Sequence, residues 1–215
     1  MRGKVVSLNV SLPVHVEASG QTFFTGYNKK PQQESVFLHK THFEGDGQGD
    51  VVHHGGLDQA VCVYPFEHYE KWNSELQLAK LLHVPSFGEN ITPMGFLEDD
   101  ACIGDVFQMG QAIVQITQPR QPCSTLACIL NRPDMIKKCV QTGRTGYYLR
   151  VLQEGLVRAD DEMFLIEKHP MGITVSKSNQ IKYGFEKDTE KIKQLLEVKE
   201  LAESFRQSLL KKSLG

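Results

Sequence analysis

The sequence predicts a mainly β protein with helices, in which a barrel or sandwich is followed by a small helical segment. Up to residue 172, short β-like runs are separated by Gly, Pro, Asp and Asn, which is typical of many strands joined by turns. After that point these runs stop, and a stretch rich in Lys, Glu and Leu continues without proline. We therefore expect two domains, at 1–172 and 173–215.

The candidate strands alternate apolar and polar residues or carry β-branched residues, as half-buried strands do. They are 3–10, 35–40, 60–64, 105–109, 111–117, 147–152 and 161–166. Gly110 separates the runs 105–109 and 111–117, which indicates a tight hairpin.

Helices are expected within the β region and again in the tail. Residues 65–83 begin with Pro65, which suits the first position of a helix, and carry large apolar residues three and four apart. A second helix is expected over 124–141, with an interruption at Pro133. The tail predicts two or three amphipathic helices from apolar residues at helical spacing: Ile192, Leu195, Leu196, Leu201, Phe205 and Leu209.

Composition and charge exclude several classes of protein. The 215 residues are 40% hydrophobic and 23% charged, which is typical of a globular chain with one sizeable core. A net charge of −2 gives no reason to expect a nucleic-acid polymer or an anionic membrane as the partner. Neither a signal peptide nor a run of about 20 apolar residues is seen, so we expect a cytoplasmic protein. Five cysteines without regular spacing argue against a disulfide framework.

One cysteine has an unusual setting, in the stretch QPRQPC at 118–123. Two prolines fix the backbone, and Arg120 stands three residues before Cys123. A guanidinium and the start of a following helix both favour the thiolate form of a cysteine, whose ordinary pKa is about 8.5. The stretch therefore predicts a fixed, ionised sulfur, although a loop corner with a packed cysteine is the simpler alternative. The remaining cysteines are expected to be structural: Cys62, Cys102, Cys128 and Cys139.

Two further polar clusters are candidates for ligand binding. The glycine-rich stretch 44–61 contains His53 and His54, and its glycines allow the backbone to come close to a ligand or to point amides at an anion. The pair Glu89 and Asn90 falls in a tight turn, where both side chains suit either backbone capping or ligand contact.

Six motifs, in order along nearly the whole chain, resemble the MOSC family, the domain related to the C-terminal part of molybdenum cofactor sulfurase. They are TGYNKKP (25–31), EGDGQGD (44–50), VHHGGLDQAV (52–61), FGEN (87–90), IGDVFQMG (103–110) and QPRQPC (118–123). The stretch TGRTGYYLRVLQEG (142–155) and the helical tail resemble the YiiM-type subgroup, the 6-N-hydroxylaminopurine resistance proteins.

The resemblance implies a MOSC-type β-barrel followed by a small C-terminal three-helix domain, and it implies bound molybdenum cofactor (molybdopterin). Cys123 corresponds to the cysteine that binds molybdenum in the family. The positions near the cofactor correspond to Lys29, His54, Gly55, Gly56, Asn90 and Arg120. The family pattern leaves Lys30 as an alternative to Lys29, and His53 as an alternative to His54.

The expected activity is reduction of N-hydroxylated compounds, such as 6-hydroxylaminopurine, to amines, which detoxifies base analogues. Cys123 binds the metal, His54 supplies the proton, and Glu89 is the reserve donor. Electrons are expected from a separate reductase, for which the helical tail is one docking place. Pyridoxal phosphate is not expected to be required. A homodimer is possible. The alternative function is a carrier that holds cofactor, or sulfur as a Cys123 persulfide, without redox turnover.

Overall fold

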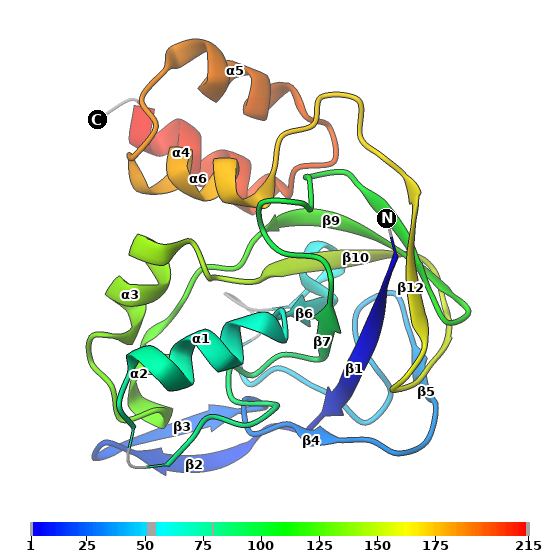
Figure 1. Cartoon of the computed structure of the whole chain (residues 1–215), viewed down its shortest axis with the longest axis vertical. Coiled ribbons are helices and arrows are strands. Elements are labelled where there is room, and N and C mark those ends of the chain that lie inside the picture. Colours follow the sequence, from blue (N-terminus) through cyan, green and yellow to red (C-terminus); the bar gives the residue numbers. More distant parts are fainter. Residues whose placement is uncertain (1, 51–54, 79, 214–215) are drawn as a thin grey trace.

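A closed β-barrel forms the body of the protein (Figure 1). The computed structural model describes residues 2–50, 55–78 and 80–213. Within these residues, seven strands follow one another in the order β12-β8-β9-β10-β6-β7-β1, and β12 pairs with β1 to close the barrel. These strands are β1 (Arg2–Val10), β6 (Val61–Val63), β7 (Ile91–Met94), β8 (Val106–Met109), β9 (Ala112–Pro119), β10 (Tyr147–Gln153) and β12 (Glu162–Glu167). The prediction of a mainly β barrel with helices is confirmed.

The predicted hairpin around Gly110 is present, with Met109 opposite Ala112 in the β8–β9 register. Several short strands were not predicted. They are β2 (Val14–Ala18), β3 (Gln21–Thr25), β4 (Lys30–Pro31), β7 and β11 (Gly155–Val157). β2 pairs with β3, β4 extends the edge of β1, and β11 pairs with β5 (Val36–Leu38). The turn at Ser19 and Gly20, where both residues have positive φ, is the local signal that marks the β2–β3 hairpin.

Three helices cover one end of the barrel (Figure 1): α4 (Val175–Tyr183), α5 (Thr189–Glu197) and α6 (Glu203–Ser213). Their apolar faces pack on the barrel core, and Val175, Leu195 and Phe205 are completely buried in the same cluster as Val114. The amide of Ala202 also donates to the carbonyl of Thr117 in β9. The helices are therefore joined to the barrel by a continuous hydrophobic core.

A second core lies under the connection between β6 and β7, which pair in parallel. Parallel neighbours need a long crossover, and here it contains helix α1 (Glu67–Glu75). Trp72 and Phe87 are buried in this second cluster, where the ring of Phe87 stacks on Tyr64 at 3.9 Å between ring centroids. The crossover thereby brings the Gly88–Asn90 turn beside β6, where Asn90 exchanges two hydrogen bonds with Cys62.

The predicted helix at 65–83 is wrong in length, because α1 ends at Glu75. Gln77 has a positive φ of 46°, which a helix does not allow, and Asn73 exchanges two hydrogen bonds with Leu82 to close the following loop. The helix expected over 124–141 is broken as predicted, into α2 (Ser124–Ile129) and α3 (Met135–Thr142).

No helix among the described residues is long and apolar enough to cross a membrane.

Candidate functional site

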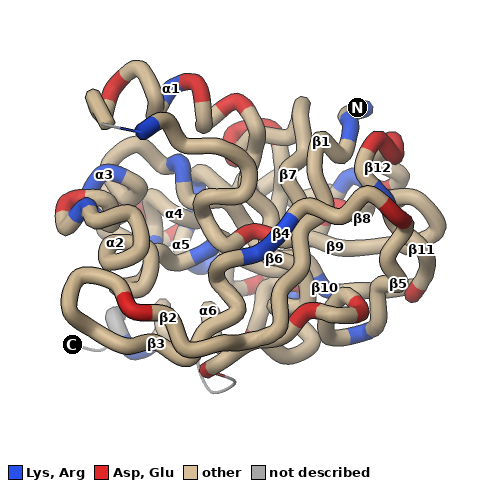
Figure 2. Tube along the Cα trace, turned by 90° about the horizontal axis from the view of Figure 1, so that it is seen from below, with Lys and Arg blue, Asp and Glu red and all other residues tan. Residues whose placement is uncertain are grey.

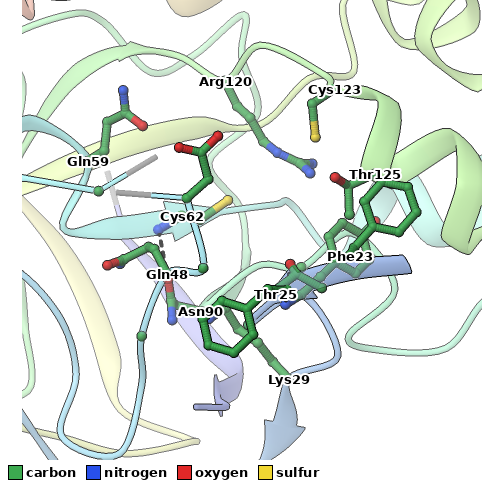
Figure 3. Close-up of a pocket in the computed structure, with 18 of the residues that line it drawn as sticks. Phe23, Thr25, Lys29, Gln48, Gln59, Cys62, Asn90, Arg120, Cys123 and Thr125 are labelled. Carbon is green, nitrogen blue, oxygen red and sulfur yellow. Dashed lines mark hydrogen bonds between the residues drawn. The ribbon is translucent and has the colours of Figure 1, made fainter. Parts of the chain in front are cut away.

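A pocket of about 430 Å³ opens beside the β2–β3 hairpin, and its volume falls in the range typical of small-molecule and cofactor sites (Figure 3). Its walls come from four segments that are distant in sequence: the hairpin and the residues after it, the glycine-rich loop with β6, the Gly88–Asn90 turn, and the β9–α2 connection with β10. The residues that line the pocket include Phe23, Phe24, Tyr27, Lys29, Gly55, Cys62, Asn90, Arg120, Cys123 and Tyr148.

Cys123 lies where β9 gives way to helix α2. β9 ends at Pro119, and Cys123, with extended backbone, is the residue that caps the start of α2. Its side chain is half-buried and lines the pocket, as do Ser124 and Thr125 in the first turn of the helix. The rigid loop expected around this cysteine is therefore a strand-to-helix connection that presents the thiol to a cavity.

Arg120 is buried at the same wall, with an exposed fraction of 5%. Its guanidinium interacts electrostatically with the thiols of Cys62 and Cys123 and with the phenols of Tyr27 and Tyr148. Burial raises the pKa of both phenols. Because these phenols stay neutral at pH 7, they leave the guanidinium charge available to an anion in the pocket.

Lys29 reaches the pocket from the other side, where it forms a buried ion pair with Asp46. Asp46 also accepts from the amide of Ser11 and from Nδ2 of Asn90, at 2.9 and 2.8 Å. The partly neutralised lysine is a hydrogen-bond donor at the pocket wall, whereas the neighbouring Lys30 is exposed in β4 and does not line the pocket.

Asn90 is buried and uses its whole side chain within the protein. Its Oδ1 accepts from the amide of Cys62 at 3.1 Å, and its Nδ2 donates to Asp46 and to the carbonyl of Asn9. The residue therefore sets the position of Cys62 and Asp46 at the pocket wall.

Glu89, although adjacent, does not line the pocket. It is completely buried and accepts hydrogen bonds from the amide of Phe87, the hydroxyl of Thr92 and the phenol of Tyr69. Burial raises the pKa of this carboxyl. The side chain caps the turn, which is one of the two roles that the sequence left open for it.

The glycine-rich loop contributes Gly55 to the pocket, while Gly56 precedes the short helix η1 (Leu57–Gln59) and does not line it. Both have positive φ. A Cβ at Gly49 would lie 1.8 Å from the carbonyl oxygen of Phe24, so this glycine lets the loop pack directly on the hairpin. His53 and His54 lie outside the described residues.

Sequence reasoning missed Cys62, Tyr27, Tyr148 and the hairpin as parts of the pocket. Cys62 lies in strand β6, as predicted. Its thiol also faces the cavity, which was not predicted (Figure 3). Burial raises its pKa to about 11. Strand alternation shows that a residue is buried but not whether it faces core or cavity, so no local pattern carried this information.

The MOSC domain model matches residues 50–164 of the chain. The chain belongs to the MOSC family. A second model, the YiiM-like 3-alpha helix domain, matches residues 173–212, which cover α4, α5 and all but the last residue of α6 in this MOSC protein. Both matches agree with the family resemblance seen in the motifs.

Curated relatives of this MOSC protein cover most of its length. It is 44% identical to the uncharacterized protein YflK of Bacillus subtilis (98% of this chain, 95% of YflK) and 33% identical to protein YiiM of Escherichia coli (84% of this chain, 80% of YiiM). A protein of Gibberella moniliformis named "Reductase" is 30% identical over 70% of this chain, but the match spans only 27% of that longer protein.

The fold of this MOSC protein is also that of a solved relative. The crystal structure of YiiM from Geobacillus stearothermophilus superposes with a TM-score of 0.81 at 33% identity, covering 98% of each chain.

Proposed function

We propose that this MOSC protein binds molybdenum cofactor in the pocket and reduces N-hydroxylated compounds to amines. The overall reaction is R–NHOH + 2 e⁻ + 2 H⁺ → R–NH₂ + H₂O. The observation that carries the proposal is that Cys123 lines one cavity together with Arg120 and Lys29. This combination offers a soft sulfur ligand and two cationic donors within a single pocket.

The residues present fit the cofactor by their donor chemistry. Among the described residues, no three His, Cys, Asp or Glu side chains come together as a metal site. One thiol ligand from Cys123 suits a metal whose other ligands belong to its own cofactor, while burial keeps the second thiol of the pocket, Cys62, protonated at neutral pH. When bound, the molybdenum cofactor supplies the two-electron redox chemistry.

The protein residues have binding and orienting roles in this proposal. Cys123 binds the metal, and Arg120 and Lys29 hold anionic groups of the cofactor by charge-assisted hydrogen bonds. The wall formed by Asn90, Asp46 and Lys29 fixes the donors before the cofactor arrives, which lowers the ordering cost of binding. Gly55 lets the loop backbone come close to the ligand.

The proton source in this proposal is His54, because the reserve donor Glu89 is turned away from the cavity. Electrons come from a separate reductase. The fungal relative supports this point, since it is named a reductase and extends far beyond the part shared with this chain. The lysines of the C-terminal helices are less available to a reductase than their number indicates, because Lys177 and Lys191 both pair with Glu186. Acidic and basic residues are also interspersed along the chain (Figure 2).

The test compares Cys123→Ser with Cys128→Ser, a matched change at a half-buried cysteine within α2. Both proteins are purified from a molybdenum-replete host and assayed for metal content and for reduction of 6-hydroxylaminopurine with an artificial reductant. We expect Cys123→Ser to lose activity and most of its molybdenum, while Cys128→Ser keeps both. Wild-type protein that binds molybdenum cofactor without turnover would instead support the carrier function. Full activity in Cys123→Ser would refute the proposed role of this thiol.

A further inference from the structure

The β2–β3 hairpin stands apart from the barrel sheet, because its two strands pair only with each other among the described strands. It is nevertheless fixed at both ends. At its tip, the hydroxyl of Ser19 donates to the carbonyl of Cys128 at 3.0 Å, and near its base Gly49 packs against the backbone of Phe24. The hairpin therefore bridges from the glycine-rich loop to helix α2 and forms one wall of the pocket.

The two faces of this hairpin differ in what they present. Phe23 lies opposite Val16, and Phe24 lies opposite His15, so strand alternation sends the two phenylalanine rings to opposite faces. The ring of Phe24 packs on His15 with 5.0 Å between ring centroids, and the residue is 52% exposed. Phe23 and Thr25 share the other, less exposed face, and both line the pocket in Figure 3; Phe24 borders the same pocket but is mostly exposed to solvent.

The pocket thus combines a wall of cations and thiols with a wall that carries an aromatic ring. A flat heterocycle stacks on an aromatic face, whereas a small aliphatic hydroxylamine gains little from it. We infer that Phe23 is a specificity-determining residue, whose ring stacks against the planar nitrogen heterocycle of the substrate. This inference rests on the proposed function for the identity of the reaction. The stacking of a heterocycle on Phe23 is a binding property of the hairpin wall and can be measured without any reaction.

The test uses Phe23→Leu, which keeps an apolar side chain and removes the ring. The matched control is Phe185→Leu, the same change at a ring that is 62% exposed and does not line the pocket. Cofactor-loaded protein is assayed with 6-hydroxylaminopurine, which carries a ring, and with N-methylhydroxylamine, which carries none. We expect Phe23→Leu to raise KM for the purine about tenfold and to leave KM for N-methylhydroxylamine and both kcat values unchanged. Phe185→Leu should change neither KM.

An equal change of KM for both substrates in Phe23→Leu would overturn the inference, as would no change for either. A loss of molybdenum in Phe23→Leu alone would also overturn it, because the ring would then serve the cofactor. If wild-type protein reduces neither substrate, the proposed function fails. Equilibrium dialysis of adenine against the same protein then tests stacking on Phe23 independently of the reaction. The inference then requires that the wild type binds adenine and that Phe23→Leu binds it about tenfold more weakly. Equal binding by the two proteins, or none by the wild type, would refute it.

Discussion

Asn90 donates from Nδ2 to Oδ2 of Asp46 at 2.8 Å, and this bond joins the crossover turn to the ion pair of Lys29. The same asparagine accepts from the amide of Cys62. One side chain therefore ties together three segments of the pocket wall, and every polar atom in it is already engaged inside the protein.

Asn90→Ala should lower the free energy of unfolding by about 3 kcal/mol, because it leaves the Cys62 amide and the Asn9 carbonyl buried without partners. Urea denaturation measures this change. The control is Asn73→Ala, whose two bonds to Leu82 are only partly buried and lie outside the pocket, and which should cost about 1 kcal/mol. An equal cost at the two positions would show that the network around Asn90 adds nothing beyond two ordinary bonds.

Arg120→Lys should reduce the molybdenum content of the purified protein, because a planar group with several donors is replaced by a point charge on a flexible stem. The loss of one charge-assisted hydrogen bond corresponds to about one to two decades in affinity. Metal analysis after identical purification measures it, with Arg120→Ala expected to lose more.

The control for this prediction is Arg144→Lys. Arg144 pairs with Glu75 and lies over the Trp72 ring, and it does not line the pocket. Unchanged molybdenum content in Arg120→Lys would mean that Arg120 only shapes the loop.

Cys62 should resist alkylation near neutral pH although it faces the pocket. Burial raises its pKa to about 11, so at pH 8 only about 0.1% is thiolate, the reactive form. Raising the pH toward 11 should increase its labelling by iodoacetamide steeply, as followed by peptide mass mapping of cofactor-free protein. Cys139, whose pKa burial raises to about 12, should react more slowly still. Complete labelling of Cys62 at pH 7 would contradict the assigned environment.

Phe205→Ala should destabilise the whole protein by about 3 to 5 kcal/mol, because this ring is completely buried in the core shared by α6 and the barrel. The comparison is Phe185→Ala, at a ring that is 62% exposed, which should cost less than about 0.5 kcal/mol. Thermal unfolding followed by circular dichroism should show one transition in both proteins. A barrel transition that keeps its midpoint in Phe205→Ala would mean that residues 173–215 fold as a separate domain.

Much of the architecture could be predicted because its signals are local. The β8–β9 hairpin has Gly110 in its turn, and the break between α2 and α3 has Pro133. Ile192 and Leu195 in α5 are three residues apart, and Phe205 and Leu209 in α6 are four apart, which is helical spacing. The end of α1 could not be predicted in the same way. It depends on the hydrogen bonds between Asn73 and Leu82, which no pattern in the helix itself reveals.

The candidate site was predictable where a motif carries unusual chemistry, as around Arg120 and Cys123. The remaining walls depend on long-range packing. Cys62 and Tyr148 lie opposite each other on neighbouring strands, and only the register of β6 and β10 sets that pair. The hairpin does carry a short signal that was missed: Val14, Val16 and Ala18 alternate with His15 and Glu17 in β2, just before the turn at Gly20.

The parallel pairing of β6 and β7 also has a consequence for how the pocket is completed during folding. The chain must leave the barrel after Val63, fold α1 and its loop around Trp72, and return at Ile91 before Asn90 can meet Cys62. Such non-local closure is slow, since the entropy of ordering the connection is lost before any contact across it forms. The ability of the pocket to bind a ligand is therefore expected to appear late in refolding, after the antiparallel hairpins have formed. Its rate should equal the rate at which the crossover between β6 and β7 packs.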